Sequence, residues 1–335
     1  MLRFKENISL KPFNTFGVEA FTKFFYEVTD LEKLKLLFKS TPELPIRILG
    51  GGSNILFTKN FDGLTLLMAT KGIKVLEEKN NKVRVEVQAG ENWHEFVLWC
   101  LKQNYGGVEN LALIPGSVGA APLQNIGAYG VELSTVFCSC KVINLHTLEE
   151  EILDKKACEF DYRSSLFKTH QKGKYLISAV TFELQKKPHQ PVLSYAGLKS
   201  RFENKKPTIQ QVAEAVIEIR QSKLPDPKLL GNGGSFFKNP VVNETVYNAL
   251  KLKFTTLPCY PSGKGQVKIP AAWLIDYIGY KGRQFGQAGV HQNQALVLVN
   301  LGEAKGSDIL KLAENIQKEV KSYFGISLEM EVNIL

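Results

Sequence analysis

Apolar residues recur along the first half of the chain at both helical and strand-like spacings. The segment 30–39 has helical spacing behind Asp30, a residue type that caps helices, and this predicts a helix. The apolar run 46–49 and the alternation over 83–88 predict two strands, and a third is expected over 175–184. Asn92 and Glu95 have the spacing of a capping box, which predicts a helix over 92–101.

Amphipathic helices dominate the second half. Thr208 and Gln211 have the spacing of a helix cap, and the periodic segment behind them reaches Arg220. Prolines at 225 and 227 then break the helix, which signals a hinge or linker. Further helices are predicted to begin near 270 and to cover 307–324, where Gly325 ends the second. Strands are expected over 295–299 and 326–334.

Length and composition limit the architecture. At 335 residues the chain exceeds the size at which one core keeps growing, so two or three domains of roughly 100–150 residues are expected. With 44% hydrophobic and 22% charged residues, and no stretch near the ~20 apolar residues that cross a bilayer, a soluble protein is predicted rather than a membrane protein. The first ten residues include Arg3, Lys5 and Glu6 and lack the apolar core of a secretory signal, which favours the cytoplasm.

Charge and cysteine usage narrow the kinds of ligand. The net charge of +9 would suit nucleic acid or small anions, but lysines are spread along the chain and form no basic block interleaved with aromatic residues. A small anionic substrate is therefore favoured over nucleic acid. The five cysteines are scattered, and even the pair Cys138 and Cys140 matches no common metal or redox motif. We expect free structural thiols and no metal.

A glycine-rich loop follows the strand predicted over 46–49. It consists of Gly50, Gly51, Gly52, Ser53, Asn54 and Ile55. Glycines after a strand expose backbone N–H groups that can receive phosphate oxygens, although a plain glycine turn would have the same sequence. Two common phosphate motifs are excluded, because the loop lacks both the Gly-Lys-Ser/Thr ending of a P-loop and the third glycine of G-x-G-x-x-G.

The segment 114–130 is rich in small residues and contains few charged ones. It suits a wall against which a large flat ligand lies, with Ser117 and Asn125 as polar contacts. A buried loop packed on helices is the structural alternative. Together with the loop at 50–55, this wall favours a dinucleotide cofactor.

The segment 231–240 places one hydroxyl, that of Ser235, between glycines and the rings of Phe236 and Phe237. Glycines allow close approach to a ligand, and the rings would exclude water, so Ser235 could act as a positioned proton donor. The alternative is a turn leading into a buried strand, with Ser235 in a local backbone hydrogen bond. These ten residues alone favour the alternative.

Four separated motifs together resemble the UDP-N-acetylenolpyruvoylglucosamine reductase family. They are the Gly-Gly-Gly-Ser-Asn loop at 50–54, the Pro-Gly-Ser-Val-Gly-Ala run at 115–120, Tyr162-Arg163 in its 158–164 context, and Gly-Ser-Phe-Phe-Lys-Asn-Pro at 234–240. The resemblance runs in order from about residue 14 to the C-terminus. It implies an α+β protein with a vanillyl-alcohol-oxidase-type (PCMH-type) FAD-binding fold. The expected domains are FAD-binding subdomain 1 (1–65, joined by strand 326–335), FAD-binding subdomain 2 (66–205) and a substrate-binding domain (206–325).

The resemblance also assigns residues to non-covalent FAD and to the sugar nucleotide. The residues expected to bind FAD are Gly50, Gly51, Gly52, Ser53, Asn54, Ile55, Gly116, Ser117, Gly119, Asn125, Gly127 and Arg220. Those expected to bind the substrate are Tyr162, Tyr195, Lys223 and Asn239. Tyr195 would fold over the diphosphate, as in the longer form of the family, and Lys223 and Asn239 would hold it. Without the resemblance, Tyr195, Lys223 and Asn239 would be ordinary solvent-exposed side chains.

Three residues are expected to be catalytic. Arg163 could grip a carboxylate bidentately or form a surface ion pair, and the resemblance implies that it stabilises the enolate. Glu329 and Glu331 share one face of the last predicted strand, and periodicity does not choose between them; the family pattern selects Glu331 as the acid. Ser235 would protonate C2 after hydride, carried from NADPH by FAD, reaches C3. This chain has Asn333 where the family usually has arginine.

These assignments predict a monomeric cytoplasmic enzyme that reduces UDP-N-acetylenolpyruvoylglucosamine and has no membrane or nucleic-acid partner. Two other classes stay open at this point. A different flavin oxidase on the same fold would lack the Ser-Phe-Phe-Lys-Asn-Pro motif and commonly carries a covalent flavin ligand. A sugar-nucleotide binding protein without chemistry would be colourless.

Overall fold

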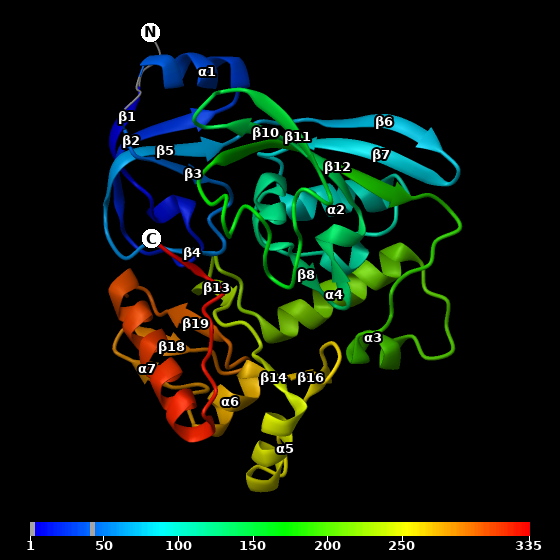
Figure 1. The fold of residues 1–335 in the computed structure, drawn as a ribbon, viewed down its shortest axis with the longest axis vertical. Helices are drawn as coiled ribbons and strands as arrows, with labels where there is room; N and C mark the ends of the chain where they lie inside the picture. Colours follow the sequence, from blue (N-terminus) through cyan, green and yellow to red (C-terminus); the bar gives the residue numbers. More distant parts are fainter. Residues whose placement is uncertain (1–3, 41–43) are drawn as a thin grey trace. The chain divides into compact units, whose positions relative to one another are not determined.

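The chain forms two compact units in the computed structural model, which describes residues 4–40 and 44–335 (Figure 1). Unit 1 comprises Met1–Ile8, Thr22–Gly51 and Phe61–Arg220, and unit 2 comprises Ser9–Phe21, Gly52–Asn60 and Gln221–Leu335. Residues 1–3 and 41–43, which belong to the first predicted domain, lie outside the described residues. The division into three domains stays a prediction.

One sheet of unit 1 carries helix α1 (Leu31–Ser40). Its order is β1-β2-β5-β3, and β5 pairs in parallel with β2 and β3. The strands are β1 (Lys5–Ser9), β2 (Phe21–Val28), β3 (Ile46–Leu49) and β5 (Phe61–Met68). Leu34 and Leu37 are buried in one cluster with Leu64 of β5, so α1 covers a face of this sheet (Figure 1). The helix predicted over 30–39 is confirmed, and Asp30 Oδ1 accepts the backbone N–H of Glu32 at 2.9 Å.

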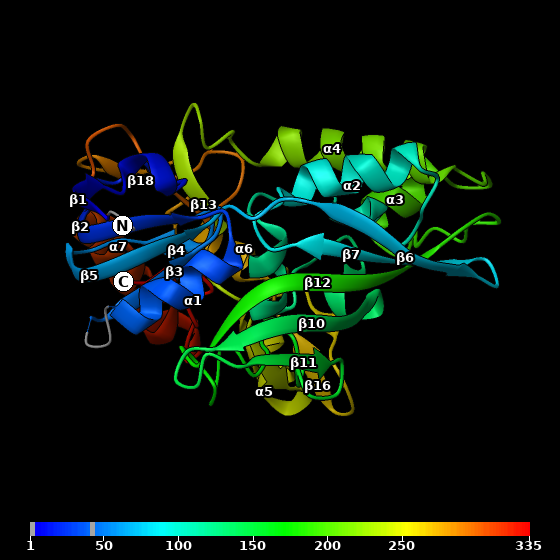
Figure 2. The ribbon, with the colours of Figure 1, turned by 90° about the horizontal axis from the view of Figure 1, so that it is seen from above.

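The other large sheet of unit 1 is antiparallel, in the order β11-β10-β12-β7-β6. Its strands are β6 (Ile73–Lys79), β7 (Lys82–Gln88), β10 (Phe137–Asn144), β11 (Glu150–Asp154) and β12 (Tyr175–Gln185). Figure 2 shows β6 and β7 extending together as a long hairpin. The strands predicted over 83–88 and 175–184 are confirmed as β7 and β12. On β7, Val83, Val85 and Val87 are buried while Arg84 is exposed, in agreement with the alternation.

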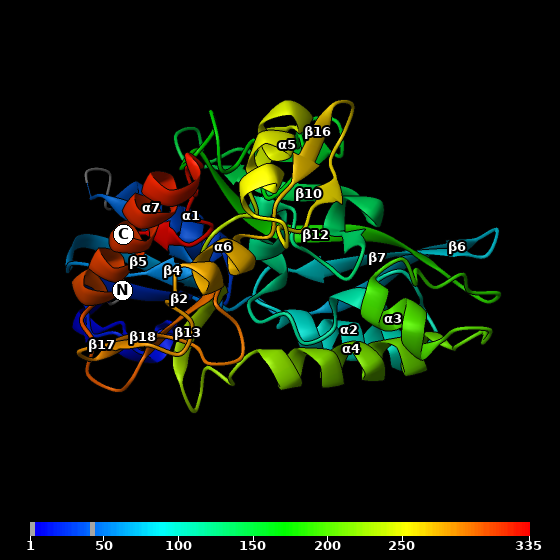
Figure 3. The same ribbon diagram turned by 90° about the horizontal axis from the view of Figure 1, so that it is seen from below.

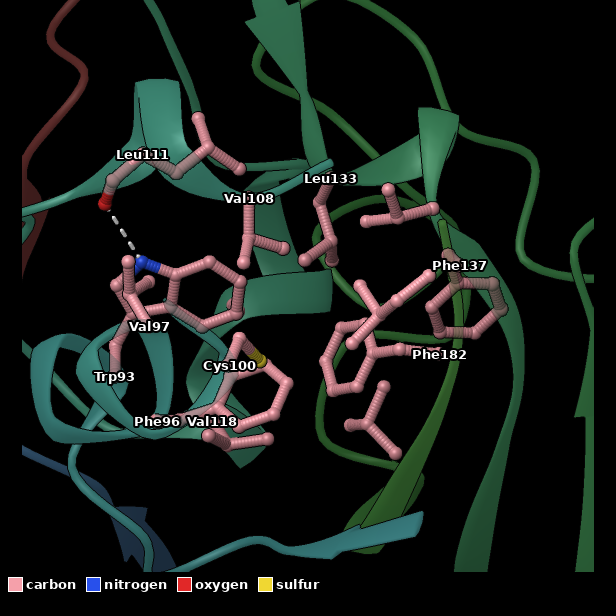
Figure 4. Close-up of a cluster of buried hydrophobic side chains, with 14 of the residues drawn as sticks. Trp93, Phe96, Val97, Cys100, Val108, Leu111, Val118, Leu133, Phe137 and Phe182 are labelled. Carbon is pink, nitrogen blue, oxygen red and sulfur yellow. Dashed lines mark hydrogen bonds between the residues drawn. The ribbon is translucent and has the colours of Figure 1, made fainter. Parts of the chain in front are cut away.

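An aromatic core joins this sheet to helix α2 (Trp93–Lys102). The ring centre of Phe182 on β12 lies 6.0 Å from that of Trp93 and 4.9 Å from that of Phe96. The buried indole Nε1 of Trp93 donates to the carbonyl of Leu111 at 2.9 Å, which satisfies its polar group (Figure 4). The helix predicted over 92–101 is confirmed, and its cap is the Asn92 side chain.

Helix α4 (Ile209–Lys223) packs into the same apolar cluster through Val212, Ala213 and Val216. Figure 3 shows it alongside α2 and near α3 (Ala196–Arg201). The two compact units therefore divide after Arg220, whereas the sequence prediction starts its third domain before this helix.

The cap and the end of α4 agree with the sequence. The Gln211 backbone N–H donates to Thr208 Oγ1 at 3.2 Å, and the Thr208 N–H donates to Gln211 Oε1 at 2.9 Å. The helix ends at Lys223, two residues before Pro225.

Short elements connect the larger ones in unit 1. They are the strand pair β8 (Gly127–Ala128) and β9 (Val131–Glu132) and the 3-10 helices η2 (Glu109–Leu111), η3 (Val118–Gln124) and η4 (Leu133–Thr135). Most of the predicted wall at 114–130 is therefore 3-10 helix and turn.

Unit 2 contains a sheet in the order β13-β19-β18-β17, with α7 (Gly306–Phe324) packed on β18 and β19 (Figure 1). The strands are β13 (Gly231–Ser235), β17 (Gln284–Phe285), β18 (Ala288–Val290) and β19 (Val297–Asn300). A smaller sheet has the order β14-β16-β15. Its strands and the remaining elements of unit 2 are short. They are β14 (Val241–Asn243), β15 (Tyr260–Pro261), β16 (Gln266–Lys268), α5 (Glu244–Lys253), α6 (Ala271–Tyr277), η1 (Lys11–Phe13), β4 (Ile55–Leu56) and β20 (Asn333–Ile334).

The predicted elements of unit 2 are confirmed except at the C-terminal segment. Helix α6 starts after Pro270, and α7 ends at Gly325, whose φ of 70° is readily available to glycine. The strand predicted over 295–299 is β19, displaced toward the C-terminus. The continuous strand predicted over 326–334 is wrong. Burial alternates from Ile326 to Glu329, but only β20 is a strand, because the backbone of this segment bonds in turn to several different partners.

Candidate active site

The two predicted glycine segments of unit 1 lie against each other. A Cβ on Gly51 would lie 2.6 Å from the Cα of Gly116, and a Cβ on Gly50 would lie 2.4 Å from Ser117 Oγ. Gly119 is equally restricted, because its Cβ would lie 2.5 Å from the Cβ of Ala89. Larger side chains would push these backbones apart. The plain-turn interpretation of 50–51 does not explain this contact, since a turn alone needs no second glycine segment.

Ser117 is buried, and its Oγ has no hydrogen-bond partner among the described residues. A buried hydroxyl without a partner is unfavourable, so it indicates a polar ligand or water at this place. The position beside two glycines matches what a phosphate-bearing cofactor requires. These residues therefore fit FAD.

The rest of the first glycine loop belongs to unit 2. Gly52 has a φ of 61°, and a Cβ there would lie 2.0 Å from the carbonyl oxygen of Phe13, so glycine is required. Ser53 is half-buried, and its carbonyl accepts from Thr15 Oγ1 at 3.4 Å. Asn54 and Ile55 connect the loop to the C-terminal segment, through a side-chain bond and the β4–β20 pair respectively.

Arg163 is held in unit 1 by the backbone of β8. Its Nη2 donates to the carbonyl of Gly127 at 2.6 Å, and its guanidinium lies 5.4 Å from the ring centre of Tyr162. A Cβ on Gly127 would lie 2.9 Å from Arg163 Nη1, so glycine gives the guanidinium its room. Arg163 has a φ of 53°, which is uncommon for a residue other than glycine and is often found at functional positions.

A second arginine of unit 1, Arg220, would suit an anionic ligand. The buried Nε of Arg220 has no hydrogen-bond partner among the described residues. Burial lowers the pKa of Arg220; the nearby Tyr129 opposes this shift, and the charge of Arg163 adds to it. Because a charged group with a buried, unpartnered nitrogen is unfavourable without a counter-charge, Arg220 fits the predicted role of holding an anionic cofactor.

Asn125 is committed to the protein through its side chain. Its Nδ2 donates to Glu132 Oε2 at 2.9 Å and to the carbonyl of Asp161 at 3.3 Å, and its Oδ1 accepts the N–H of Ser134 at 2.9 Å. It thereby fixes the segment that precedes Arg163. A contact with a cofactor would come from its backbone or from the second lone pair of Oδ1.

Tyr195 packs against a residue that the sequence interpretation missed. Its ring lies 4.8 Å from that of Tyr129 in an edge-on arrangement. The buried Asn110 ties the two segments together, because its Nδ2 donates to the carbonyls of Tyr129 and Val192, each at 2.9 Å. The glycines beside Ala128 and Tyr129 could have drawn attention to Tyr129, whereas Asn110, which follows Glu109, has no such signal.

Ser235 and Glu331 lie on adjacent segments of unit 2. Phe236 and Phe237 are fully buried, as predicted for the rings beside Ser235. The Glu331 N–H donates to the Phe236 carbonyl at 2.8 Å, and Phe237 pairs with Met330. Ser235 ends strand β13, whose pairing with β19 is irregular between Asn232 and Ser235. The residue is therefore in a bulged strand rather than in a turn.

The other residues expected to bind the diphosphate have unequal surroundings. Asn239 Oδ1 accepts the N–H of Ala271 at 2.9 Å, at the start of α6. Lys223 is exposed at the end of α4. The alternative acid, Glu329, is mostly exposed and forms an ion pair with Lys238 at 2.5 Å.

The predicted free thiols are confirmed at all five cysteines. Within 4–40 and 44–335 no cluster of acidic, histidine or cysteine side chains could hold a metal ion. In the same ranges, no helix has both the length and the apolar character needed to cross a membrane.

Two family models match the chain. Residues 226–335 match the C-terminal domain of UDP-N-acetylenolpyruvoylglucosamine reductase, and residues 24–146 match an FAD binding domain. The predicted α+β fold with an FAD-binding domain is thus confirmed.

Similar proteins cover essentially the whole chain. A UDP-N-acetylenolpyruvoylglucosamine reductase of Flavobacterium johnsoniae is 46% identical over 100% of both chains, and one of Pseudomonas fluorescens is 46% identical over 99% of both. The crystal structure of a UDP-N-acetylenolpyruvylglucosamine reductase from Thermus caldophilus has a TM-score of 0.71 at 22% identity and covers 100% of this chain and 99% of its own.

Proposed function

Because the chain belongs to the UDP-N-acetylenolpyruvoylglucosamine reductase family, we propose that it reduces the enolpyruvyl group of that sugar nucleotide with NADPH, forming UDP-N-acetylmuramate. The reaction would serve peptidoglycan precursor synthesis in the cytoplasm, with the protein acting as a monomer. The observation that supports this proposal most directly is the contact of Gly50 and Gly51 with Gly116 and Ser117, which leaves a buried hydroxyl for a cofactor.

Residues of both glycine segments would hold the cofactor. Gly50, Gly51, Gly116 and Gly119 allow close backbone approach, and the N–H groups of 52–55 would face phosphate oxygens. Arg220 would supply a counter-charge, and Ser117 a hydrogen bond. When bound, FAD supplies hydride transfer from the nicotinamide to C3 of the enolpyruvyl group.

The catalytic side chains would stabilise charge and deliver a proton. Arg163, oriented by the Gly127 carbonyl, would bind the substrate carboxylate and stabilise the negative charge that develops toward it. A protonated Glu331 would stabilise the same charge from another direction. Ser235 Oγ would donate its proton to C2, beside the buried rings of Phe236 and Phe237, which exclude water there.

The remaining residues would bind the sugar nucleotide. Tyr195 would lie over the diphosphate, with Tyr162 beside the carboxylate-binding arginine. Lys223 is exposed and long enough to reach an anion, and Asn239 retains its Nδ2 as a donor when Oδ1 caps α6.

The visible spectrum of the purified protein tests the proposal first. We expect flavin absorbance without covalent attachment, and anaerobic NADPH oxidation on addition of UDP-N-acetylenolpyruvoylglucosamine. A colourless protein would instead indicate a sugar-nucleotide binding protein. A coloured protein that ignores this substrate would indicate another flavin oxidoreductase.

A Ser235→Ala variant tests the proton donor. Loss of a general acid lowers the rate by about 100- to 10,000-fold, so flavin reoxidation by the sugar nucleotide should slow by that factor. Flavin reduction by NADPH should stay normal, because it does not need this proton. Stopped-flow absorbance resolves the two half-reactions. Reoxidation at the wild-type rate would show that Ser235 is not the donor.

A further inference from the structure

We propose that Asn333 and Asn54 are a pair of positioning residues that hold Glu331 beside Ser235. The proposal rests on the proposed function, in which Glu331 and Ser235 act on the same substrate. Neither asparagine needs to touch the reacting atoms. All the contacts involved lie within unit 2.

One side of Glu331 is fixed by the segment that follows Ser235. The Glu331 N–H donates to the Phe236 carbonyl at 2.8 Å, and the Lys238 N–H donates to the Glu329 carbonyl at 2.9 Å. These two bonds flank the bridge between Phe237 and Met330. Because Phe236 is fully buried, this backbone forms a rigid support.

The other side of Glu331 is fixed by the two asparagines. Asn54 Nδ2 donates to the Glu331 carbonyl at 3.1 Å. The Asn54 carbonyl in turn accepts two hydrogen bonds from Asn333, one from its backbone N–H at 3.0 Å and one from its side-chain Nδ2 at 2.9 Å. The backbone N–H and carbonyl of Glu331 are therefore both hydrogen-bonded. Asn54 bonds the carbonyl, and the Asn333 side chain orients Asn54.

The pair also connects Glu331 to the predicted cofactor loop, since Asn54 lies between Ser53 and Ile55. A change in the Asn54 backbone would move Glu331 and the loop together. Catalytic groups must be held within a fraction of an ångström for efficient transfer, so a second tether on this backbone has a direct effect on rate.

The chain beyond Asn333 does not depend on its side chain. The Leu335 N–H donates to the Leu56 carbonyl at 2.9 Å, and the Leu335 carbonyl accepts from Thr58 N at 2.7 Å and Thr58 Oγ1 at 2.9 Å. The backbone bond from Asn333 to Asn54 would also survive a side-chain substitution. A variant at 333 should therefore fold and keep its flavin.

The test uses Asn333→Asp in the flavin-loaded full chain. Aspartate has the same shape as asparagine but replaces the Nδ2 donor with an oxygen that faces the Asn54 carbonyl. We expect flavin reoxidation by the sugar nucleotide to slow by about 10- to 100-fold, the scale of a misplaced catalytic group. Flavin reduction by NADPH and flavin content should stay close to wild type, because the backbone bond from Asn333 to Asn54 remains.

Asn248→Asp is the matched control, because it makes the same chemical change at an exposed position of α5. It should leave both half-reactions unchanged. Asn333→Ala, which removes the donor without adding charge, should slow reoxidation as Asn333→Asp does. Equal slowing of both half-reactions, or an Asn333→Asp variant that reoxidises at the wild-type rate, would overturn the positioning role. If the wild-type flavoprotein itself were not reoxidised by the substrate, the proposed function would fail instead.

Discussion

At the scale of single residues, the contacts of Glu329 and Glu331 distinguish these two carboxylates, whereas the periodicity of the sequence does not. Glu329 and Glu331 are two positions apart, so both were expected on one face. The Glu329 side chain is 69% exposed and paired with Lys238, whereas Glu331 is half-buried and has both backbone groups bonded within unit 2. These contacts favour Glu331 over Glu329 as the proposed acid.

Paired glutamine variants check this assignment. Glu331→Gln removes the acid, and we expect flavin reoxidation by the sugar nucleotide to fall by about 100- to 10,000-fold. Glu329→Gln removes an ion pair between an exposed carboxylate and the mostly buried Lys238, outside the proposed catalytic groups, so its kinetics should stay much closer to wild type. Both are measured by single-turnover absorbance. A large loss in Glu329→Gln with a normal Glu331→Gln would reverse the assignment.

Residues with a motif around them could be found from sequence, and isolated ones could not. Ser235 and Arg163 are predicted as catalytic residues because the motifs around them resemble those of the family. Asn110 was missed because its importance comes from carbonyls at 129 and 192, far away in the chain. Arg220 was predicted from the resemblance, but the buried Nε that has no partner among the described residues is seen only in the folded structure.

At the scale of elements, one buried amide holds the loop that carries Tyr195. Asn110 Nδ2 bonds the segment after β8 to the segment before α3, and the rings of Tyr129 and Tyr195 meet beside it. A Cβ on Gly130 would lie 2.5 Å from Ser194 Oγ, which confirms how closely the two segments approach. The position of Tyr195 therefore depends on this bridge.

An Asn110→Asp variant should weaken substrate binding more than catalysis. It removes both donors and turns a carboxylate toward two carbonyls. Two lost hydrogen bonds of about 1 kcal/mol each would raise KM for the sugar nucleotide by about 10- to 30-fold if the loop must be ordered to bind. Steady-state kinetics measure this change, with Asn80→Asp at an exposed turn as control. An unchanged KM would show that the bridge does not affect binding.

Helices were easier to predict than strands because their ends carry local signals. Asp30, Asn92 and Thr208 cap the helices that follow them, and Gly325 ends α7, each through contacts within a few residues. The alternation over 326–334 instead reports which side chains are buried. It does not show which backbone each residue pairs with. The first part of this segment bonds to residues 236–238, and the last part bonds to residues 54–56.

At the scale of the whole molecule, the chain passes between units several times before residue 61. Sequence patterns show no composition change at these crossings, so they could not be predicted. The glycine loop contains one crossing, because Gly51 belongs to unit 1 and Gly52 to unit 2. A ligand that binds the folded chain at this loop would stabilise the fold.

Removal of FAD should therefore lower the stability of the protein. A ligand at about 100 times its Kd stabilises the folded state by about 2.7 kcal/mol, so the Tm of flavin-free protein should rise as FAD is added. Circular dichroism during heating measures the shift. Gly51→Ala should abolish it, because the added Cβ would lie 2.6 Å from Gly116 Cα. A wild-type Tm that is independent of FAD would contradict FAD binding at this loop.

The arrangement of thiols gives the natural chain a ready means of fluorescent labelling. Cys100, Cys140 and Cys158 are buried, whereas Cys138 in unit 1 and Cys259 in unit 2 are partly exposed. Maleimide dyes should reach only the last two, which places one dye on each unit without any mutation. Burial, with help from Glu183, raises the pKa of the Cys138 thiol, so a mildly alkaline buffer will be needed there. Both dyes would then be attached without any engineered cysteine.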